Sequence, residues 1–168
     1  WTAPPNDGGS PILGYTVQPY EGPAETETPL APLDSPGAGT AFTVLGLTNG
    51  TEYRFEVTAY NALGDGPTST KSASFIPFGK PDAPTAVTAV ATATDPTLAP
   101  DEVRVSWTPP TDNGRAITSY EIQKEDNTSG WTDADPVAAP ADNVVIGGLT
   151  KFNSWSFRVR AVNEAGAG

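Results

Sequence analysis

Residues 47–66 read LTNGTEYRFEVTAYNALGDG, and the same pattern returns at residues 149–168 as LTKFNSWSFRVRAVNEAGAG. In each copy, hydrophobic side chains alternate with polar or charged ones, which is the period of a β-strand with one buried face. The residues expected to face inward are Tyr53, Phe55, Val57 and Ala59 in the first copy, and Trp155, Phe157, Val159 and Ala161 in the second. A preceding leucine and the following asparagine and glycines place each strand between two turns. Two copies of this strand predict two domains.

The repeat extends upstream of this strand, which indicates a whole domain rather than a local motif. Trp1 matches Trp107, and each tryptophan precedes a proline-rich loop, TAPPNDGGSPI or TPPTDNGRAI. Each loop leads into a strand that begins with an aromatic residue, Tyr15 or Tyr120. The spacing between equivalent residues makes each unit about a hundred residues long, which is the usual size of a β-sandwich domain.

These motifs together resemble the fibronectin type III family. The features that carry the resemblance are a Trp before a Pro-Pro-x-Asp-x-Gly loop, a Tyr-led strand, and the run Leu-x5-Tyr-x-Phe-x-Val-x-Ala-x-Asn-x-x-Gly. The resemblance covers nearly the whole chain. It implies an all-β fold, namely two immunoglobulin-like antiparallel β-sandwiches in tandem, each with seven strands in the complete family fold.

The resemblance also implies a tyrosine corner, in which a tyrosine hydroxyl near the start of the repeated strand bonds to the backbone just upstream. Leu47 and Tyr53 match this corner in the first copy. Trp155 replaces the tyrosine in the second copy, and an indole N–H donates a hydrogen bond but cannot accept one. We therefore expect the second corner to depart from the family's usual bond.

The first domain is expected to cover residues 1–79. Its predicted strands are residues 12–18, 40–45, 51–60 and 68–76. Residues 19–40, rich in proline, glycine and acidic residues, are expected to form a loop with at most one short strand. Because Trp1 matches the end of the family's second strand, the first strand and most of the second are expected to be missing. Residues 77–84, PFGKPDAP, contain three prolines and predict a short, semi-rigid linker.

The second domain is expected to cover residues 80–168. Its predicted strands are residues 85–91, 102–107, 117–125, 130–132, 143–146 and 153–162. The chain ends in the loop after the last of these, so the final strand of the family fold is expected to be missing. We expect the 168 residues to be an excerpt of a longer molecule. In isolation it should aggregate or stay partly unfolded, because unpaired strand edges recruit other strands.

The composition excludes several function classes. The 18 prolines and 17 glycines would interrupt helices and suit short strands joined by turns. The absence of cysteine excludes disulfides and thiolate chemistry, and the absence of histidine removes the commonest general base and zinc ligand. A formal charge of −11 opposes binding to nucleic acid or to an anionic membrane surface. No apolar stretch of about 18 residues is present to span a bilayer.

The acidic residues form no recognisable catalytic or metal-binding motif. The candidates for calcium ligands are Asp126, Asp133, Asp135 and Asp142. They lack the alternating spacing of a calcium-binding loop. Glu25 and Glu27 are close enough in sequence to suggest a glycosidase pair, but we interpret them as solvated loop charges. We predict no catalytic residue, no metal site and no cofactor.

Further motifs are interpreted as turns or surface features. Asp7 and Asp112 recur before glycine, where an aspartate typically caps the backbone of its own turn. The segments Asn49-Gly50-Thr51 and Asn127-Thr128-Ser129 match the glycosylation acceptor pattern, which a bacterial source would leave unmodified. The first of these is also explained as the turn before a strand.

Three aromatic residues, Tyr20, Phe78 and Trp131, fall in predicted loops or strand edges. An exposed aromatic side chain can stack on a sugar ring or anchor a protein partner. The alternative, which we favour, is that each ring packs over the end of its own sandwich.

The resemblance implies a non-catalytic spacer and adhesion or presentation module of a larger extracellular or cell-surface protein. Its partners would be neighbouring domains, adjacent subunits, or a protein or polysaccharide surface, with no nucleic acid and no membrane insertion. The composition, with few lysines and no cysteine, resembles that of secreted or surface proteins of bacteria with GC-rich genomes. Two alternatives stay open: an accessory segment of a secreted carbohydrate-active enzyme, or a repeat in a surface or phage-tail assembly.

Overall fold

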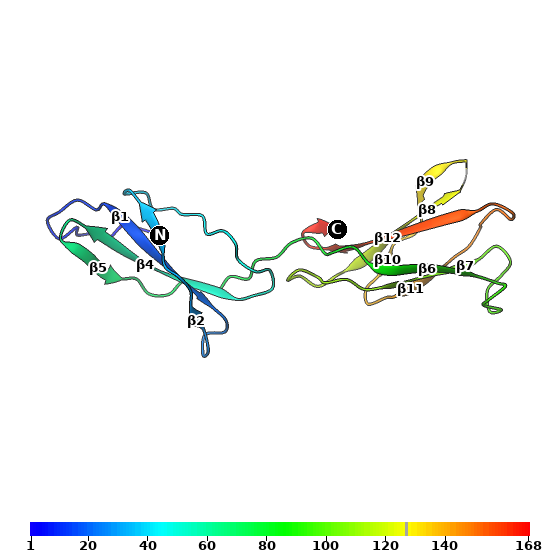
Figure 1. Cartoon of the computed structure of the whole chain (residues 1–168), viewed down its shortest axis with the longest axis horizontal. Coiled ribbons are helices and arrows are strands. Elements are labelled where there is room, and N and C mark those ends of the chain that lie inside the picture. Colours follow the sequence, from blue (N-terminus) through cyan, green and yellow to red (C-terminus); the bar gives the residue numbers. More distant parts are fainter. Residues whose placement is uncertain (127) are drawn as a thin grey trace. The chain divides into compact units, whose positions relative to one another are not determined.

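The computed structural model describes residues 1–126 and 128–168, which form two compact units, Trp1–Pro77 and Phe78–Gly168. Both units consist of antiparallel β-strands joined by turns and loops (Figure 1). No helix occurs in the described part of the chain, so no helix there could cross a membrane. The predicted all-β fold is confirmed, while the division between residues 79 and 80 stays a prediction.

The second unit is a sandwich of two sheets. One sheet has the strand order β11–β7–β6, and the other has the order β10–β8–β12–β13 with β9 paired to β8. The strands of the first sheet are β6 (Thr85–Ala91), β7 (Val103–Thr108) and β11 (Asn143–Ile146). The strands of the other are β8 (Ser119–Asp126), β9 (Gly130–Asp133), β10 (Val137–Ala138), β12 (Trp155–Asn163) and β13 (Gly166–Ala167). All the strands predicted for this unit are present, with ends that shift by one or two residues at most.

Two short strands of this unit were not predicted. β10 pairs with the start of β8, where Val137 lies opposite Tyr120, and β13 pairs with the end of β12, where Ala167 lies opposite Val162. Two residues are too few to show an alternating pattern, so local sequence carries no signal for them. They form because a long neighbouring strand offers backbone groups for pairing.

The core of the second unit lies between its two sheets. Val105 on β7, Ile122 on β8 and Ala161 on β12 have 0%, 1% and 0% of their surface exposed. The rings of Trp107 and Tyr120 pack with centroids 5.0 Å apart. Trp155, Phe157 and Val159 pack against this core, so the inward positions predicted for β12 are confirmed.

The first unit contains one sheet with the strand order β2–β1–β4–β5, in which β3 also pairs with β1. Its strands are β1 (Gly14–Glu21), β2 (Thr28–Pro29), β3 (Leu33–Pro36), β4 (Tyr53–Asn61) and β5 (Gly64–Thr68). The two long strands pair from Gly14 opposite Tyr60 to Glu21 opposite Tyr53. Tyr15, Val17 and Tyr53 are buried on this sheet.

β1 is longer than predicted, because it continues past Pro19 where the sequence indicated a loop. A proline has no N–H to donate, but the Pro19 carbonyl accepts hydrogen bonds from the Leu30 N–H and from Gln18 Nε2, both at 2.9 Å. The short strands β2 and β3 also lie in this region, where at most one was expected. Pairing with β4 stabilises the part of β1 around Pro19, which the local sequence does not favour as a strand.

The predicted strand at residues 40–45 is wrong, since residues 40–47 belong to no strand. In the second unit the equivalent strand, β11, pairs with β7 from Asn143 opposite Ser106 to Ile146 opposite Val103. The counterparts of these β7 residues fall before Trp1 in the repeat and are not among the 168 residues. Alternation alone does not produce a strand when no ladder partner is present.

The predicted strand at residues 68–76 is also wrong in its bounds, because β5 ends where it was expected to begin. Beyond Thr68 the chain still runs beside β4, but serine hydroxyl groups take the place of some backbone acceptors in the hydrogen-bond ladder. The Val57 N–H donates to Ser69 Oγ at 3.0 Å, and the Phe55 N–H donates to Ser72 Oγ at 3.1 Å. Hydroxyl groups that bond to the backbone in this way compete with a regular strand.

The tyrosine corner of the first unit and its tryptophan counterpart in the second both close, with opposite hydrogen-bond polarity. In the first unit the Thr48 N–H donates to the Tyr53 hydroxyl oxygen at 3.0 Å. In the second unit Trp155 Nε1–H donates to the carbonyl oxygen of Thr150 at 3.3 Å. Thr48 and Thr150 occupy the same position of the repeat. The tyrosine hydroxyl accepts a hydrogen bond from the amide of this residue, whereas the indole N–H donates one to its carbonyl. The predicted departure from the usual bond is confirmed.

Replacing Ile122 by alanine is expected to lower the free energy of unfolding of the second unit by about 2–5 kcal/mol, because a fully buried side chain is lost and a cavity remains. Arg160→Ala, on the outer face of β12, is the matched control. Its ion pair with Glu121 is exposed, so its loss should change the stability little. Urea denaturation measures both effects, and equal losses of stability would contradict the assignment of the two faces.

Replacing Tyr53 by phenylalanine removes the oxygen that accepts the Thr48 N–H. We expect faster hydrogen exchange at the Thr48 amide and a loss of about 1 kcal/mol in the stability of the first unit. Exchange measured by NMR reports the change, and the amides of the second unit serve as the internal control. An unchanged exchange rate at Thr48 would show that the corner bond does not form in solution.

Candidate functional site

Each unit carries the same aspartate turn in its proline-rich loop. Asp7 Oδ1 accepts a hydrogen bond from the Gly9 N–H at 2.9 Å, and Asp112 Oδ1 accepts one from the Gly114 N–H at 3.0 Å. Both carboxylates cap the backbone of their own turn, as predicted. Their role in the structure is to shape the loop.

An asparagine at the end of the long strand ties this loop to the sheet in each unit. Asn163 on β12 is 5% exposed, and its Nδ2 donates to the carbonyls of Asp112 at 2.9 Å and Arg115 at 3.2 Å. Asn61 on β4 makes the equivalent bond to the Asp7 carbonyl at 2.6 Å. The local sequence pattern did not predict that these asparagines anchor the proline-rich loop. The presence of an asparagine at the same position of both copies was a signal for this role.

The residues at the junction are anchored within one unit or the other. In the first unit the Pro77 carbonyl accepts a hydrogen bond from the Gly50 N–H at 2.9 Å. In the second unit the Gly79 N–H donates to the Asn113 carbonyl at 2.9 Å, and the Gly79 carbonyl accepts from Asn163 Nδ2 at 2.8 Å. A single residue separates the two anchored positions.

That residue is Phe78, one of the three aromatics predicted to lie in a loop. Its ring is 37% exposed, and the guanidinium carbon of Arg115 lies 4.5 Å from the ring centroid. Two residues further, the Lys80 carbonyl accepts a hydrogen bond from Asn113 Nδ2 at 2.8 Å. The chain that follows Pro77 is therefore held on the second unit, and the linker has little free length.

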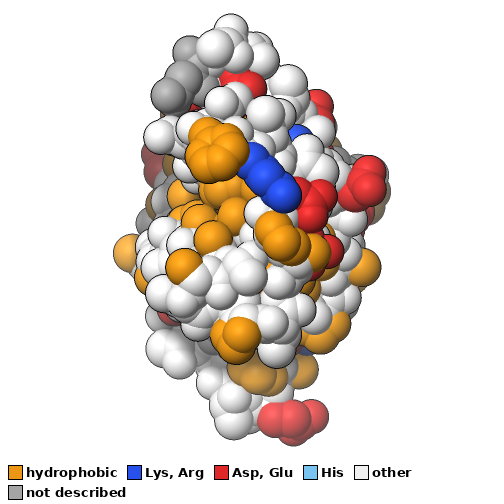
Figure 2. Space-filling model, turned by 90° about the vertical axis from the view of Figure 1, so that its right-hand side faces the viewer, with side chains coloured by type: hydrophobic (Ala, Val, Ile, Leu, Met, Phe, Trp, Pro, Cys, Tyr) orange, Lys and Arg blue, Asp and Glu red, His pale blue; other side chains and the backbone are white. Residues whose placement is uncertain are grey.

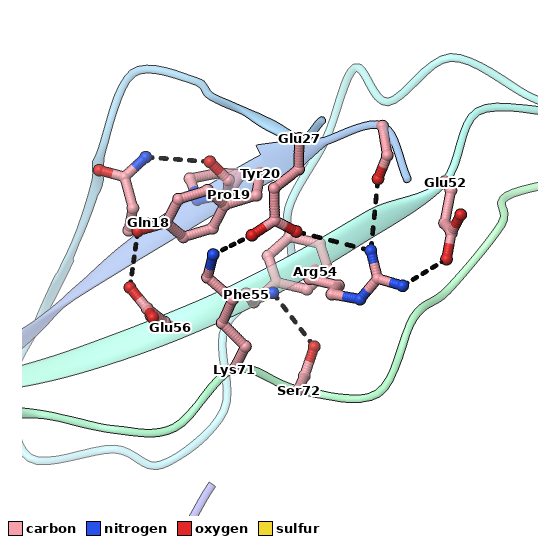
Figure 3. A network of polar contacts seen from close by, with 11 residues as sticks. Gln18, Pro19, Tyr20, Glu27, Glu52, Arg54, Phe55, Glu56, Lys71 and Ser72 are labelled. Carbon is pink, nitrogen blue, oxygen red and sulfur yellow. Dashed lines mark hydrogen bonds and ion pairs between the residues drawn. The ribbon is translucent and has the colours of Figure 1, made fainter. Parts of the chain in front are cut away.

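Glu27 is not the solvated loop charge that the sequence suggested, so that prediction is wrong. Its side chain is 9% exposed and lies between two cations, Arg54 with Nη1 at 3.5 Å and Lys71 (Figure 3). Arg54 also pairs with Glu52 at 2.6 Å. The two cations lie 27 and 44 residues along the chain from Glu27, so no local pattern could reveal them. Glu25 is exposed, as expected.

Tyr20 joins the same polar network on the outer face of the first unit's sheet (Figure 3). Its hydroxyl donates to Glu56 Oε2 at 2.6 Å, and Lys71 Nζ lies 4.0 Å from the ring centroid. The bond to the Glu56 carboxylate favours the neutral phenol and raises the pKa of Tyr20 above its usual value. This aromatic side chain is therefore engaged within its own unit.

Trp131 on β9 is an exposed aromatic side chain that could meet a ligand. It is 37% exposed, and the guanidinium carbon of Arg158 lies 4.3 Å from its ring centroid. Arg158 Nε donates to Gln123 Oε1 at 2.6 Å, which fixes the arginine across β8 and β12. An aromatic ring beside hydrogen-bonding side chains is an arrangement that can stack on a sugar ring.

Three of the four aspartates considered for calcium, Asp126, Asp133 and Asp142, bond to turns or side chains instead. Asp126 Oδ1 accepts hydrogen bonds from the N–H of Thr128, from its hydroxyl, and from the N–H of Ser129, and these bonds lower the pKa of Asp126 to about 2. Asp133 and Asp142 each accept a bond from an amide side chain at 2.7 Å. Within residues 1–126 and 128–168, no group of three or more acidic side chains is placed to hold a metal ion.

The acceptor pattern at Asn49-Gly50-Thr51 lies in the turn before β4, where Gly50 has a φ of 80°. Asn127, the first residue of the other acceptor pattern, lies outside the described residues. Phe152 is the counterpart of Gly50 in the second unit, with a φ of 70° and a fully exposed side chain. A bulky residue in this left-handed region is uncommon, and local sequence did not single it out.

Positive charge is sparse on the surface. Figure 2 shows few Lys and Arg side chains among hydrophobic and acidic ones on the face that it presents. The sequence has 9 basic residues against 20 acidic ones. Arg54, Lys71, Arg104, Arg115 and Arg160 are paired with carboxylates. This distribution differs from the clustered cations of a nucleic-acid-binding surface.

The chain is similar to known proteins over nearly all of its length. The family model of the fibronectin type III domain matches residues 1–75 and 82–168. Fibronectin type-III domain-containing protein 3a of Gallus gallus is 32% identical, over 100% of this chain and 13% of that protein. Pikachurin of Homo sapiens is 30% identical, over 96% of this chain and 16% of that protein. Endoglucanase B of Cellulomonas fimi is 29% identical, over 96% of this chain and 15% of that protein.

These relatives are much longer than the present chain, which spans 13%, 16% and 15% of their lengths. The family model matches each of the two units separately. The antiparallel strands, the corner at Tyr53 with its counterpart at Trp155, and the repeated loops agree with that match. The chain therefore belongs to the fibronectin type III domain family.

Proposed function

We propose that this chain is a non-catalytic spacer and presentation module of a larger extracellular protein. Its two units are modules of a family that the relatives named above carry within much longer chains, and this supports a role as part of a larger protein. Asp7, Asp112 and Asp126 shape turns, and Glu27 pairs with cations, so these carboxylates already have structural roles. The proposed task is mechanical: to hold neighbouring parts of a protein at a set separation.

The anchored junction is the observation that carries this proposal. The Pro77 carbonyl is bonded within the first unit, and Gly79 is bonded within the second through both its N–H and its carbonyl. A spacer keeps its neighbours at a fixed distance only when its linkers are short and stiff. A short, proline-containing linker is semi-rigid. With only Phe78 between the anchored residues, the joint has little length over which to flex.

The proposed location is outside the cell or at its surface, and the proposed source is bacterial. The absence of cysteine and the abundance of Ala, Thr, Pro, Gly and Asp support a bacterial surface protein. The similarity to Endoglucanase B of Cellulomonas fimi is consistent with such a source. The partners proposed for the presented surface are neighbouring domains or subunits, or a protein or polysaccharide surface.

An accessory role in a carbohydrate-active enzyme is the second candidate, and Trp131 favours it. The ring is exposed and lies beside the Arg158 guanidinium, which carries hydrogen-bond donors. Two relatives named for enzymes, Endoglucanase B of Cellulomonas fimi and Chitinase A1 of Niallia circulans, match nearly the whole chain, over 96% and 99% of it. This role would place the chain between other domains of an enzyme and would add weak contact with the polysaccharide.

Replacing Asn163 by alanine is expected to loosen the junction, because the Gly79 carbonyl loses its donor. NMR relaxation of backbone amides measures the tumbling of each unit, and we expect shorter correlation times in the variant. Asn61→Ala is the matched control, since it breaks the equivalent loop bonds in the first unit and none at the junction. The same relaxation in the parent protein and in Asn163→Ala would argue against a restrained joint.

Sedimentation with insoluble cellulose or chitin separates the two candidate functions. For a pure spacer, we expect the protein to remain in the supernatant. Binding that disappears in Trp131→Ala would favour the accessory role, because that change removes the exposed ring. Phe78→Ala is the matched control, since Phe78 is equally exposed at 37% and also lies under an arginine.

A further inference from the structure

The sequence contains two Asn-Gly pairs, Asn49-Gly50 and Asn113-Gly114. Asparagine is chemically labile, because its side-chain amide can react with the backbone nitrogen of the residue that follows. Glycine has no side chain to shield that nitrogen, so an Asn-Gly pair is especially reactive. The two pairs offer the same chemistry, and the fold decides how readily each of them reacts.

The side chain of Asn113 is fixed by the second unit. Its Nδ2 donates to the Lys80 carbonyl at 2.8 Å and to Asp82 Oδ1 at 3.0 Å. The Gly114 N–H, which belongs to the nitrogen that would react, donates to Asp112 Oδ1 at 3.0 Å. Both reacting groups of this pair are therefore bonded to other partners.

The side chain of Asn49 has no such bonds. It is exposed and makes no hydrogen bond with the described part of the chain. Lys151 occupies the same position of the repeat in the second unit, where the sheet of β6, β7 and β11 is present, and it is exposed as well. The exposure of Asn49 is therefore a property of the turn before the long strand.

One backbone hydrogen bond opposes the reaction at Asn49. The Gly50 N–H donates to the Pro77 carbonyl at 2.9 Å, and the Thr51 N–H closes the turn on the Thr48 carbonyl at 3.3 Å. The Gly50 nitrogen must lose its proton before it can attack, and the bond to Pro77 holds that proton. Backbone bonds of exposed turns open locally at a low free energy. This bond therefore slows the reaction without preventing it.

We propose that Asn49 is a site of spontaneous deamidation, gated by the hydrogen bond from Gly50 to Pro77. A base in solution removes the Gly50 amide proton, and the nitrogen forms a bond to Asn49 Cγ. The Cγ–Nδ2 bond breaks, and the side-chain nitrogen takes up a proton and leaves as ammonia. Water then opens the cyclic imide at either carbonyl, which leaves aspartate or isoaspartate at position 49. Base and water are the only co-reactants.

Isoaspartate changes the backbone of the turn as well as its charge. The main chain then passes through Cβ and Cγ of residue 49, so it is longer by a carbon atom before Gly50. This displaces the Gly50 N–H from the Pro77 carbonyl, the bond that anchors the end of the first unit. The reaction itself is independent of the spacer role, and only this consequence bears on the junction.

The test incubates the complete 168-residue chain at mildly basic pH and follows both pairs by peptide mapping with mass spectrometry. We expect the products to form about tenfold or more faster at Asn49 than at Asn113, because two side-chain hydrogen bonds must also break at Asn113. In denaturing urea both pairs should react rapidly and at similar rates. The native rate at Asn49 should lie below its rate in urea, because the Gly50 bond must open first.

Three outcomes would overturn the proposal. These are no conversion at Asn49, equal native rates at Asn49 and Asn113, and a rate at Asn49 that is the same with and without urea. The last result would show that the bond from Gly50 to Pro77 does not gate the reaction.

Two variants test the protection and the consequence separately. Asp82→Ala removes one acceptor of the Asn113 side chain, so the rate at Asn113 should rise several-fold while the rate at Asn49 stays the same. Asn49→Gln forms the corresponding larger ring far more slowly. Hydrogen exchange at the Gly50 amide should therefore accelerate on incubation of the parent chain and not of this variant. An unchanged rate at Asn113 in Asp82→Ala, or equal exchange at Gly50 in both chains, would contradict the proposal.

Discussion

The pairing of two long antiparallel strands is the constraint on which both units depend. β8 pairs with β12 from Ser119 opposite Val162 to Asp126 opposite Trp155, and β1 pairs with β4 over the same length. Because side chains alternate between faces, this register places one set of hydrophobic residues on one face, and a slip of one residue would reverse it. The core, the corners and the loop anchors all take their positions from this pairing.

The same strand pair is buried to different extents in the two units. Ala161 is fully buried in the second unit, where the sheet of β6, β7 and β11 covers it, whereas its counterpart Ala59 in the first unit is half-buried. The residues that face inward are alike in the two copies. The difference lies in what covers them, because residues 41–47 have no ladder partner in the first unit.

Hydrogen bonds and ion pairs between distant residues fasten the loops of each unit to its long strands. Asn163 connects the end of β12 to the proline-rich loop and to Gly79 at the junction, so one side chain links the core strand to the linker. The carboxylate of Glu27 connects its loop to β4 and to Lys71 in the same manner. Both side chains are nearly inaccessible to solvent, which is where the loss of a hydrogen-bond partner is most costly.

The sequence by itself determined the two-domain organisation, the inward faces of the long strands and the aspartate turns, because alternation and turn chemistry act between near neighbours. Phe157 and Ala161 lie inward as predicted. Tertiary structure alone decided which extended segments become strands and which polar side chains become structural. Residues 40–45 alternate but lack a partner, whereas β1 continues through Pro19 because β4 lies beside it. Strand formation and ion pairing need groups from distant parts of the chain, and local sequence does not specify how far away those groups lie.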